Sequence, residues 1–348
     1  MSVHLRPVNG GAMRYSINLV RKEKISVDVP AHNKLSPRRG RLSNGVKFKI
    51  ADIVFKLTSR YPVIFKDNRE LYLRKYGNFI YRGKQNSAIN ISVDVVEKFP
   101  FFPGKKVFAV YEDGGDEERW RLWENKNEYV YHCPIPERES MAFVAKDFSS
   151  ARAYVPPFEG RFAWDIKDIL YDLMQVMLIN YFAYNKNGLI LHAAAVKDGR
   201  QAIVFAGKSG NGKSTTARLW HRYSKAVVLN DDRVIVRKTA KDFFAYSGPW
   251  HGEFGNSVEA FPNQARLCGL FVLEHAKKNF CCTLPREEAF RTLYPTLFSV
   301  FWNRLLMDNT LSLCEELIDT AAVSRLGFVK DKNIISFVRQ ELDERDSV

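Results

Sequence analysis

The stretch that most constrains the fold of this chain is FAGKSGNGKSTT at residues 205–216. Residues 207–214 fit the pattern GxxxxGK[ST] at every fixed position. An apolar segment precedes the pattern and a segment compatible with a helix follows it. Because a phosphate-binding loop requires this order of strand, loop and helix, we predict such a loop here rather than an ordinary glycine-rich turn.

The residue types in this stretch match the chemistry of phosphate binding. Glycines allow backbone N–H groups to converge on phosphate oxygens, and the N-terminus of the following helix adds partial positive charge. A lysine in the last part of the loop reaches the β- and γ-phosphates, and the next hydroxyl binds Mg²⁺. The expected nucleotide-binding residues are Gly207, Lys208, Ser209, Gly210, Asn211, Gly212, Lys213, Ser214 and Thr215, with Lys213 also catalytic and Ser214 also a metal ligand.

Phosphoryl transfer also needs a carboxylate for the metal and a group that handles the acceptor. Asp231 and Asp232 end the apolar run AVVL and are the candidates, one directed at Mg²⁺ and the other at the substrate hydroxyl. The alternative is a polar turn between two strands, for which NDDR is suitable. His192 interrupts an apolar strand with alanines beside it, and we expect it in the site; the alternative is a buried structural histidine.

Three further features are weaker candidates. Residues 248–253, GPWHGE, combine turn formers with an aromatic ring, an imidazole and a carboxylate, which suits either a pocket wall or a surface loop. Arg266 precedes an expected strand and either contacts the transferred phosphate or lies exposed. Glu274 ends that strand and has no specific pattern around it.

The chain is long enough for two domains, and its residue composition and hydrophobic pattern change near residue 155. Residues 1–155 mix β-branched and aromatic residues with turn signals, so we predict a β-rich domain without a catalytic constellation. Residues 156–348 carry the loop and form the predicted catalytic domain. In the first part the expected strands are 24–29, 46–57, 70–76, 90–96, 106–112 and 141–146.

The second part alternates helical and extended patterns. Apolar residues at helical spacing predict a helix over 164–188 that ends at Gly188. A hairpin of 189–196 and 201–207 then leads into the loop. The remaining predictions are a helix at 214–223, strands within 225–238, at 243–248 and at 267–275, and helical structure between 286 and 322.

Composition limits the expected location of the protein and the partners it binds. No apolar run reaches the ~20 residues of a membrane span, and no signal peptide is recognisable, although Met13 is an alternative start. Five cysteines without a CxxC pair favour reduced thiols and a cytoplasmic location. The net charge is +14, and residues 1–50 hold eleven Lys and Arg against Glu23 and Asp28. Because stacking aromatics are not interleaved with these charges, we do not expect a nucleic-acid partner.

Several of these stretches together resemble a known family. LHAAAV, AIVFAGKSGNGKSTTARLW, VVLNDDRVIV, SGPWHGE and LCGLFVLE are similar to the catalytic domain of HPr kinase/phosphorylase and its relatives, over about residues 160 to 325. The resemblance implies an α/β (α+β) P-loop domain of the type shared with ATP-dependent phosphoenolpyruvate carboxykinase. It implies ATP and Mg²⁺ as cofactors, His192 in the active site, Asp231 as catalytic base and Asp232 near the metal.

Two departures bear on the substrate. The signature rich in Glu, Arg and Gly that follows the aspartate pair in HPr kinases is missing, and residues 1–150 do not resemble that family's N-terminal domain. HPr is therefore not the expected acceptor. The SGPWHGE and LCGLFVLE stretches look more like divergent kinase-like members, some found with peptide-modification genes.

The sequence thus favours a Mg²⁺- and ATP-dependent kinase that phosphorylates a hydroxyl, chiefly Ser or Thr of a protein or peptide, with Asp231 as base. The alternative from another class is a nucleotide-gated binding module in which the β-rich domain engages a partner. A decarboxylating carboxykinase is disfavoured, because no second arginine and lysine constellation for a small dicarboxylate is present. The identity of the acceptor and the oligomeric state, a homo-oligomer included, stay open.

Overall fold

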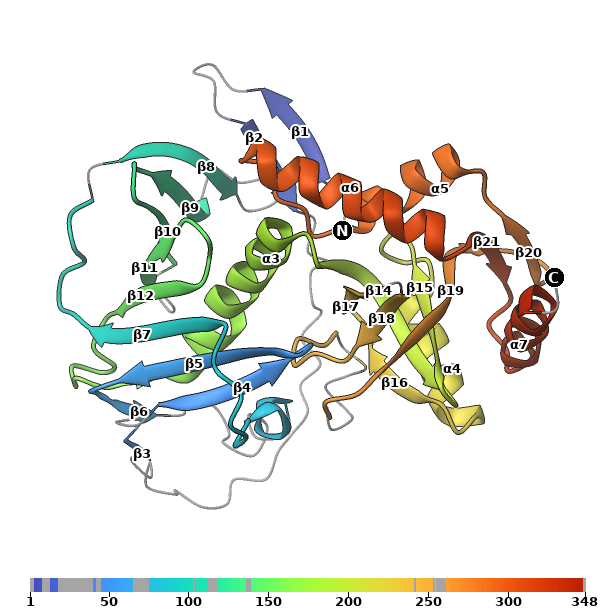
Figure 1. Ribbon diagram of the computed structural model, residues 1–348, viewed down its shortest axis with the longest axis horizontal. Helices are drawn as coiled ribbons and strands as arrows, with labels where there is room; N and C mark the ends of the chain where they lie inside the picture. The colour runs from blue at the N-terminus through green and yellow to red at the C-terminus, as the bar shows by residue number, and fades with distance from the viewer. Residues whose placement is uncertain are drawn as a thin grey trace. The chain divides into compact units, whose positions relative to one another are not determined.

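The computed structural model describes residues 3–7, 13–17, 40–41, 45–64, 75–102, 104–111, 118–135, 139–240, 242–252, 254 and 261–346. It is a mixed α/β structure with large β-sheets and few helices (Figure 1), which confirms the predicted class at this level. The chain forms two compact units. The first comprises Met1–Val46, Lys56–Arg69 and Ile89–Leu173, and the second comprises Lys47–Phe55, Glu70–Ala88 and Met174–Val348.

The first unit is built on a β-sheet with the strand order β1-β2-β8-β9-β10-β11-β12-β7-β5. The strands expected at 90–96, 106–112 and 141–146 are confirmed as β7, β8 and β11, whereas β9, β10 and β12 were not expected. A three-stranded sheet has the order β13-β6-β3. The strand bounds are β1 Val3–Pro7, β2 Met13–Ile17, β3 Gly40–Arg41, β5 Ile53–Ser59, β6 Pro62–Ile64, β7 Ile89–Val95, β8 Lys105–Tyr111, β9 Glu118–Glu124, β10 Glu128–Cys133, β11 Ser140–Ala145, β12 Ser150–Val155 and β13 Trp164–Asp165.

Two predicted strands differ in the structure. The stretch 46–57 is divided into β4 (Val46–Ile50) and β5, because Ala51 and Asp52 take left-handed φ values of 47° and 62° and turn the chain back. Of the stretch 70–76, the structure describes residues 75–76, which are helical and continue into the 3-10 turn η1 (Gly77–Phe79). Residues 70–74 of the predicted strand lie outside the described residues.

The predicted helix over 164–188 forms, with two differences. It consists of α2 (Ile166–Asp168), the π-helical segment η3 (Ile169–Leu173) and α3 (Met174–Asn185). Gly188 does not end the helix as predicted, because the left-handed residue is Lys186, at φ 49°. Gly188 is instead the first residue of the following strand.

The second unit contains a further sheet with the strand order β15-β14-β17-β18-β19-β21-β20, and β16 pairs with β14. The predicted hairpin, the helix after the loop and the strands at 225–238, 243–248 and 267–275 are confirmed. Its elements are β14 Gly188–Asp198, β15 Gln201–Ala206, α4 Lys213–Tyr223, β16 Val227–Asn230, β17 Arg233–Thr239, β18 Asp242–Tyr246, β19 Gln264–His275, β20 Phe280–Thr283, α5 Arg286–Leu293, η4 Tyr294–Thr296, α6 Arg304–Thr320, β21 Val323–Phe328 and α7 Asn333–Asp346.

Strand β15, which leads into the predicted phosphate loop, is paired on both sides. It is antiparallel to β14 and parallel to β19. Because β14, β17, β18 and β19 are also paired in succession, these five strands close into a ring. The loop therefore extends from a strand that is fixed along both edges.

Two apolar cores lie on opposite faces of β14 and β15. Leu191, Ala193 and Val204 face a core that includes residues of α5 and α6. The alternate residues Ala194 and Phe205 face a second core with residues of α4 and α7. Figure 1 shows α5 and α6 on one side of these strands and α4 on the other. Because both faces of these strands are buried, both sets of alternate residues are apolar, and each strand is a continuous apolar run in the sequence.

Some expectations fall outside these elements. The predicted strand at 24–29 and most of the basic segment at 1–50 lie outside the described residues. The single boundary expected near residue 155 stays a prediction. Among the described residues, no helix combines the length and apolar character needed to cross a membrane.

Candidate functional site

The predicted phosphate loop connects β15 to α4. Gly207, Gly210 and Gly212 have φ values of 152°, 86° and 91°, a region that favours glycine over any side chain. Gly212 precedes the first helical residue, so the loop ends at the N-terminus of α4. This is the backbone geometry that directs N–H groups and the positive end of a helix dipole toward an anion. Ser214 and Thr215 follow in the first turn of α4, both half-buried.

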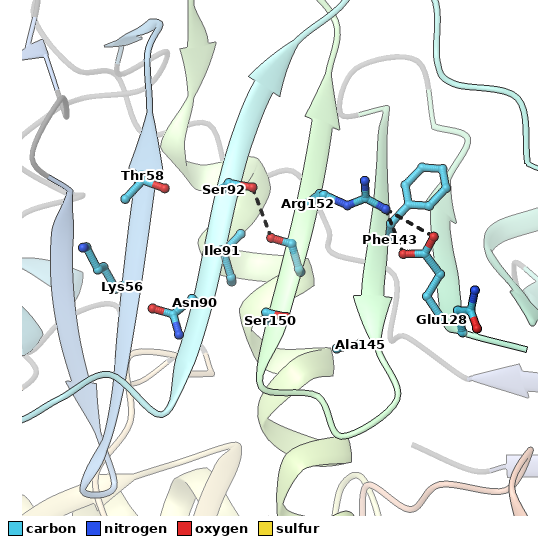
Figure 2. Close-up of a pocket in the computed structure, with 12 residues that line it drawn as sticks. Lys56, Thr58, Asn90, Ile91, Ser92, Glu128, Phe143, Ala145, Ser150 and Arg152 are labelled. Atoms are coloured by element: carbon cyan, nitrogen blue, oxygen red, sulfur yellow. Dashed lines mark hydrogen bonds and ion pairs between the residues drawn. The ribbon is translucent and has the colours of Figure 1, made fainter.

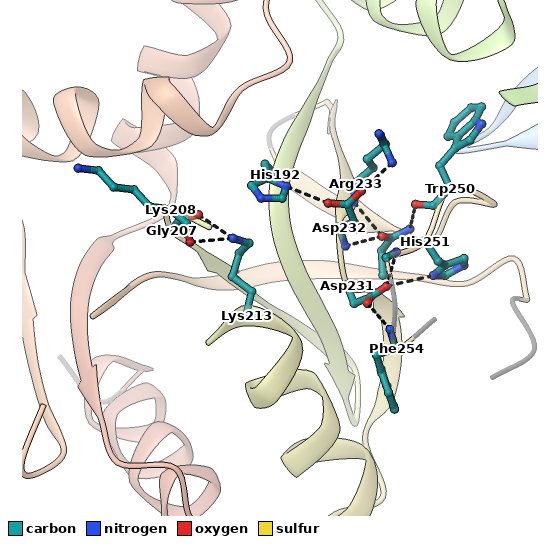
Figure 3. A network of polar contacts seen from close by, with 12 residues as sticks. His192, Gly207, Lys208, Lys213, Asp231, Asp232, Arg233, Trp250, His251 and Phe254 are labelled. Carbon is teal, nitrogen blue, oxygen red and sulfur yellow. Dashed lines mark hydrogen bonds and ion pairs between the residues drawn. The ribbon is translucent and has the colours of Figure 1, made fainter. Parts of the chain in front are cut away.

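Lys213 lies inside the curve of the loop. Its Nζ donates hydrogen bonds to the carbonyl oxygens of Gly207 at 2.9 Å and Lys208 at 3.0 Å (Figure 3), and the residue is 6% exposed. Burial lowers the pKa of Lys213 to about 8, although the charge of Asp232 acts in the opposite direction. A buried ammonium group surrounded by loop backbone is well placed to meet a phosphate.

Contacts from two neighbouring strands fix the loop. Asn211 Nδ2 donates to the carbonyl oxygen of Leu273 at 2.8 Å, and His275 Nε2 lies 3.0 Å from the carbonyl oxygen of Gly210. A Cβ atom on Gly212 would lie 2.4 Å from Cζ of Phe328. The glycine is therefore required both by its backbone conformation and by close packing against the end of β21.

His192 and Asp232 meet beside the loop. His192 Nδ1 lies 2.9 Å from Asp232 Oδ1, and Arg233 donates a 2.6 Å hydrogen bond to Asp232 Oδ2. Burial raises the pKa of the Asp232 carboxyl, but His192, Arg233 and the charge of Lys213 outweigh it, so the pKa lies below its usual range. Asp232 is therefore an ionised carboxylate, with 22% of its side chain exposed.

Asp231 faces away from this pair. Its Oδ1 accepts a hydrogen bond from the Gly252 backbone at 2.8 Å, and its Oδ2 accepts one from Phe254 at 3.0 Å. His251 Nδ1 lies 3.7 Å from Oδ1, and the Asp231 side chain is 0% exposed. Both oxygens thus bind the backbone of the 252–254 segment, a placement that does not suit the expected role of Asp231 as the base acting on an incoming hydroxyl.

Asn230, which the sequence does not single out, holds the aspartate turn in place. Its Oδ1 accepts hydrogen bonds from the backbone N–H groups of Asp232 and Arg233, both at 2.9 Å. Its Nδ2 donates to the carbonyl oxygens of Gly248 at 3.3 Å and Trp250 at 3.2 Å. An asparagine before two turn residues is a known turn former, and that was the only signal that could have found it.

Phe298, in the segment before α6, contacts both neighbours of Asp232. Its ring is edge-on to the His192 ring, with centroids 6.5 Å apart, and it lies 5.5 Å from the guanidinium carbon of Arg233. The Phe298 N–H donates to the carbonyl oxygen of Ile190 on β14 at 2.9 Å. Nothing in the sequence around residue 298 indicates this contact, because it joins segments about a hundred residues apart.

The weaker candidates have structural partners. Within residues 248–253, Trp250 is buried and Gly252 binds Asp231, whereas Glu253 lies outside the described residues. Arg266 donates to exposed Asp242 at 2.9 Å. Glu274 lies 3.7 Å from Arg325, which also pairs with Glu288. The structure therefore brings together the loop, His192 and Asp232, and gives Arg266 and Glu274 surface ion pairs.

The donor groups next to Lys213 fit Mg²⁺. Ser214 supplies a hydroxyl in the first turn of α4, and Asp232 supplies an ionised carboxylate. Mg²⁺ prefers oxygen ligands and takes only one or two from the protein when it binds with a nucleotide. Asp231 is not part of this donor set, because its side chain is 0% exposed and its oxygens are directed at the backbone N–H groups of Gly252 and Phe254.

The first unit has a separate hollow on the face of its sheet, with a volume of about 450 Å³ (Figure 2). Both polar and apolar side chains line it, and Arg152 pairs with Glu128 at 2.9 Å while lying over the Phe143 ring. Thr58 and Ser92 add hydroxyl groups from neighbouring strands. None of the predicted nucleotide-binding residues lines it.

The second unit thus has the predicted phosphate loop, residues 207–214, next to an ionised aspartate and a histidine, on a ring of mainly antiparallel strands. Residues 163–321 match the family model described as SynChlorMet cassette protein ScmC. This match covers less than half of the chain, and it includes the loop, His192 and the aspartate pair. No curated protein matches the chain. The similarity to ScmC is therefore concentrated in the segment that carries the candidate site.

Proposed function

We propose that the protein is a Mg²⁺- and ATP-dependent kinase of the HPr-kinase-like class that transfers the terminal phosphate to a hydroxyl of a protein or peptide. The observation that carries the proposal is the His192–Asp232 contact beside Lys213 and the phosphate loop. A loop alone supports nucleotide binding, whereas a histidine held by a carboxylate next to it supports chemistry on an acceptor. The similarity of residues 163–321 to ScmC is compatible with this proposal and names no activity.

In the proposed mechanism, His192 rather than Asp231 takes the proton. The low pKa of Asp232 makes it a weak base, but its ionised carboxylate fixes the His192 ring through Nδ1 and leaves Nε2 for the acceptor. The acceptor oxygen bonds to the terminal phosphorus as the bond to ADP breaks, and the hydroxyl proton passes to His192 Nε2. Lys213 and the loop N–H groups stabilise the charge on the phosphates. Ser214 and Asp232 would hold Mg²⁺, which supplies further neutralisation of phosphate charge.

The test combines nucleotide binding with phosphate transfer. Wild-type protein and the Asp232→Asn variant are titrated with MgATP and then given labelled ATP with a set of serine- and threonine-containing peptides. Asp232→Asn should still bind ATP through the loop and Lys213, should bind MgATP more weakly because a proposed Mg²⁺ ligand is lost, and should lose about 100-fold or more of transfer. Asp242→Asn, which removes the same charge from the exposed pair with Arg266, is the matched control and should transfer normally.

A wild-type protein that binds MgATP but neither transfers phosphate to any peptide nor hydrolyses ATP would overturn the kinase proposal. That result would favour the nucleotide-gated binding module. Equal losses in Asp232→Asn and Asp242→Asn would instead show that the effect is not specific to the site.

A further inference from the structure

Three parallel strands of the second unit end at the same edge as the phosphate loop. β15 is parallel to β19, with Ala206 opposite Val272, and β19 is parallel to β21, with His275 opposite Phe328. The segments that follow these strands are therefore neighbours: residues 207–213, 276–279 and 329–332. In α/β sheets, ligands bind outside the carboxyl ends of parallel strands.

Hydrogen bonds join these three segments into one surface. Asn211 and His275 connect the loop to the end of β19, as described above. Asn279 Oδ1 accepts from the N–H of Val329 at 2.9 Å, which connects the segment after β19 to the segment after β21. The edge is thus continuous from the loop to the start of α7.

Five exposed lysines lie on this edge, which we call the basic edge. No ion pair within the described part of the chain involves any of these lysines. The two acidic residues nearby have other partners. Glu274 pairs with Arg325, and Asp331 Oδ1 accepts from the N–H of Asn333 at the start of α7. The positive charge is therefore available to an anionic ligand. The basic edge consists of Lys208, Lys277, Lys278, Lys330 and Lys332.

The nucleotide does not account for this charge. A bound triphosphate is matched by the loop N–H groups, the α4 N-terminus, Lys213 and Mg²⁺. The lysines after β19 and β21 exceed that requirement. They also lie on the side of β15 away from β14, which carries His192. Figure 3 shows Lys208 extending away from Lys213, His192 and Asp232.

We propose that the basic edge binds an acidic segment of the phosphate acceptor. The proposal rests on the proposed kinase function and adds the chemistry of its substrate. From β14 to β21 there are three strand spacings of about 4.8 Å, or ~14 Å. An extended peptide covers that span in about four residues. The acidic residues should therefore lie about four or more positions from the phosphorylated hydroxyl.

The experiment uses fluorescent fifteen-residue peptides (about 50 Å when extended) with one serine at the centre. One set carries glutamates about four to seven positions from the serine on either side, and the matched set carries glutamines there. Binding to the full chain is measured by anisotropy, without and with MgATP, for wild type and two double variants, Lys277→Gln/Lys278→Gln and Lys330→Gln/Lys332→Gln. The matched control is Arg222→Gln/Lys225→Gln, which removes two exposed charges near the other end of α4.

We expect wild type to prefer the glutamate peptide, and each basic-edge variant to weaken that binding about tenfold, with a loss of affinity as salt rises. The control variant should bind the glutamate peptide like wild type, and all variants should bind MgATP like wild type. If the basic-edge variants lost affinity for MgATP to the same extent as affinity for the glutamate peptide, the nucleotide would be the ligand of the basic edge and the proposal would be overturned. Equal weakening in the control, no preference for glutamate, or tighter binding of a single-stranded oligonucleotide would also overturn it.

Binding and transfer separate the two proposals. Phosphate transfer that shows no preference for acidic peptides and no dependence on the basic-edge lysines would leave the kinase function standing and remove this inference. Lysine-dependent binding of the glutamate peptide without any transfer would remove the kinase function and leave an anion-binding edge.

Discussion

Lys213 combines a positive charge with burial, and this combination makes its protonation sensitive to a ligand. Nearly every part of the side chain is covered, and Nζ is held by two loop carbonyl groups. Burial disfavours the charged form in the empty loop, whereas a triphosphate would favour it. Nucleotide binding and proton binding at Lys213 should therefore be linked.

This linkage predicts the pH dependence of nucleotide affinity. Because the pKa of Lys213 is about 8 in the empty loop, affinity for ATP should be complete below that pH and should fall as pH rises above it. The loss should be about fivefold between pH 8 and 9 and should approach tenfold per pH unit above that range. Calorimetric titration at several pH values measures it. The Lys213→Met variant should bind weakly with no such slope, and a flat wild-type profile over the same range would contradict the prediction.

The adjacent aspartates show what the sequence can and cannot predict at this scale. The residue types and their place at a strand end indicated two carboxylates with different directions, and the structure has them so. Which one faces the loop depends on how Asn230 and the 248–254 segment bind the turn. Those contacts join residues about twenty positions apart, so no local pattern identifies Asp232 as the one beside His192.

At the scale of elements, the loop, helix α4 and the ends of β19 and β21 form one packed arrangement. The hairpin and helix around the loop were predictable because their residues are consecutive and strongly patterned. Strands β9, β10 and β12 were not predicted. Four of the seven residues of β9, ERWRLWE, are charged, and β12, SARAYV, alternates alanines with polar residues, so neither forms a run of large apolar side chains. The pairing of β15 with β19 joins residues more than sixty positions apart and has no signal in the sequence.

Two loop glycines allow backbone strain and packing to be separated. Gly210→Ala and Gly212→Ala both place a side chain at a left-handed φ, which costs about 1–2 kcal/mol. Only Gly212→Ala also meets Phe328, which is 1% exposed and stacks on His275, so it should cost a further ~1–3 kcal/mol. Gly210 has nothing within 4 Å of the added atom. Urea unfolding measures both, Phe328→Leu should relieve part of the Gly212→Ala loss, and equal losses in the two variants would contradict the packing argument.

At the scale of the whole molecule, the two units differ in what the sequence says of them. The second unit carries the loop, the aspartate turn and most of the match to ScmC, whereas we recognised no catalytic motif in the sequence of the first unit. Residues 47–55 count with the second unit, where Tyr246 donates a 3.0 Å hydrogen bond to Asp52 and Arg237 donates a 2.7 Å bond to the carbonyl oxygen of Ala51. A change of composition along the chain cannot reveal that a short segment within the first unit's sequence belongs to the second unit.

The cysteines provide a measure of opening of the second unit. Cys282 is exposed on β20, whereas Cys314 is buried in α6, and burial, with a smaller effect of Glu315, raises its pKa to about 12. Iodoacetamide should therefore label Cys282 in the native protein and Cys314 only when the core opens. Mass spectrometry of peptides at increasing urea measures both rates. Cys282→Ser should remove the fast reaction alone, and comparable native-state rates at both thiols would contradict the burial of Cys314.

The order of the segments along the chain has a consequence for synthesis. His192, the loop and Asp232 lie within about forty consecutive residues, and β15, β16 and β17 all pair with β14. The lysines of the basic edge lie up to a hundred residues later, and β15 has only one of its two neighbours until β19 has been made. A nascent chain can therefore form the histidine–aspartate contact before it can close the strand ring, and the residues of the surface proposed for the acceptor are complete only after Lys332 has been added.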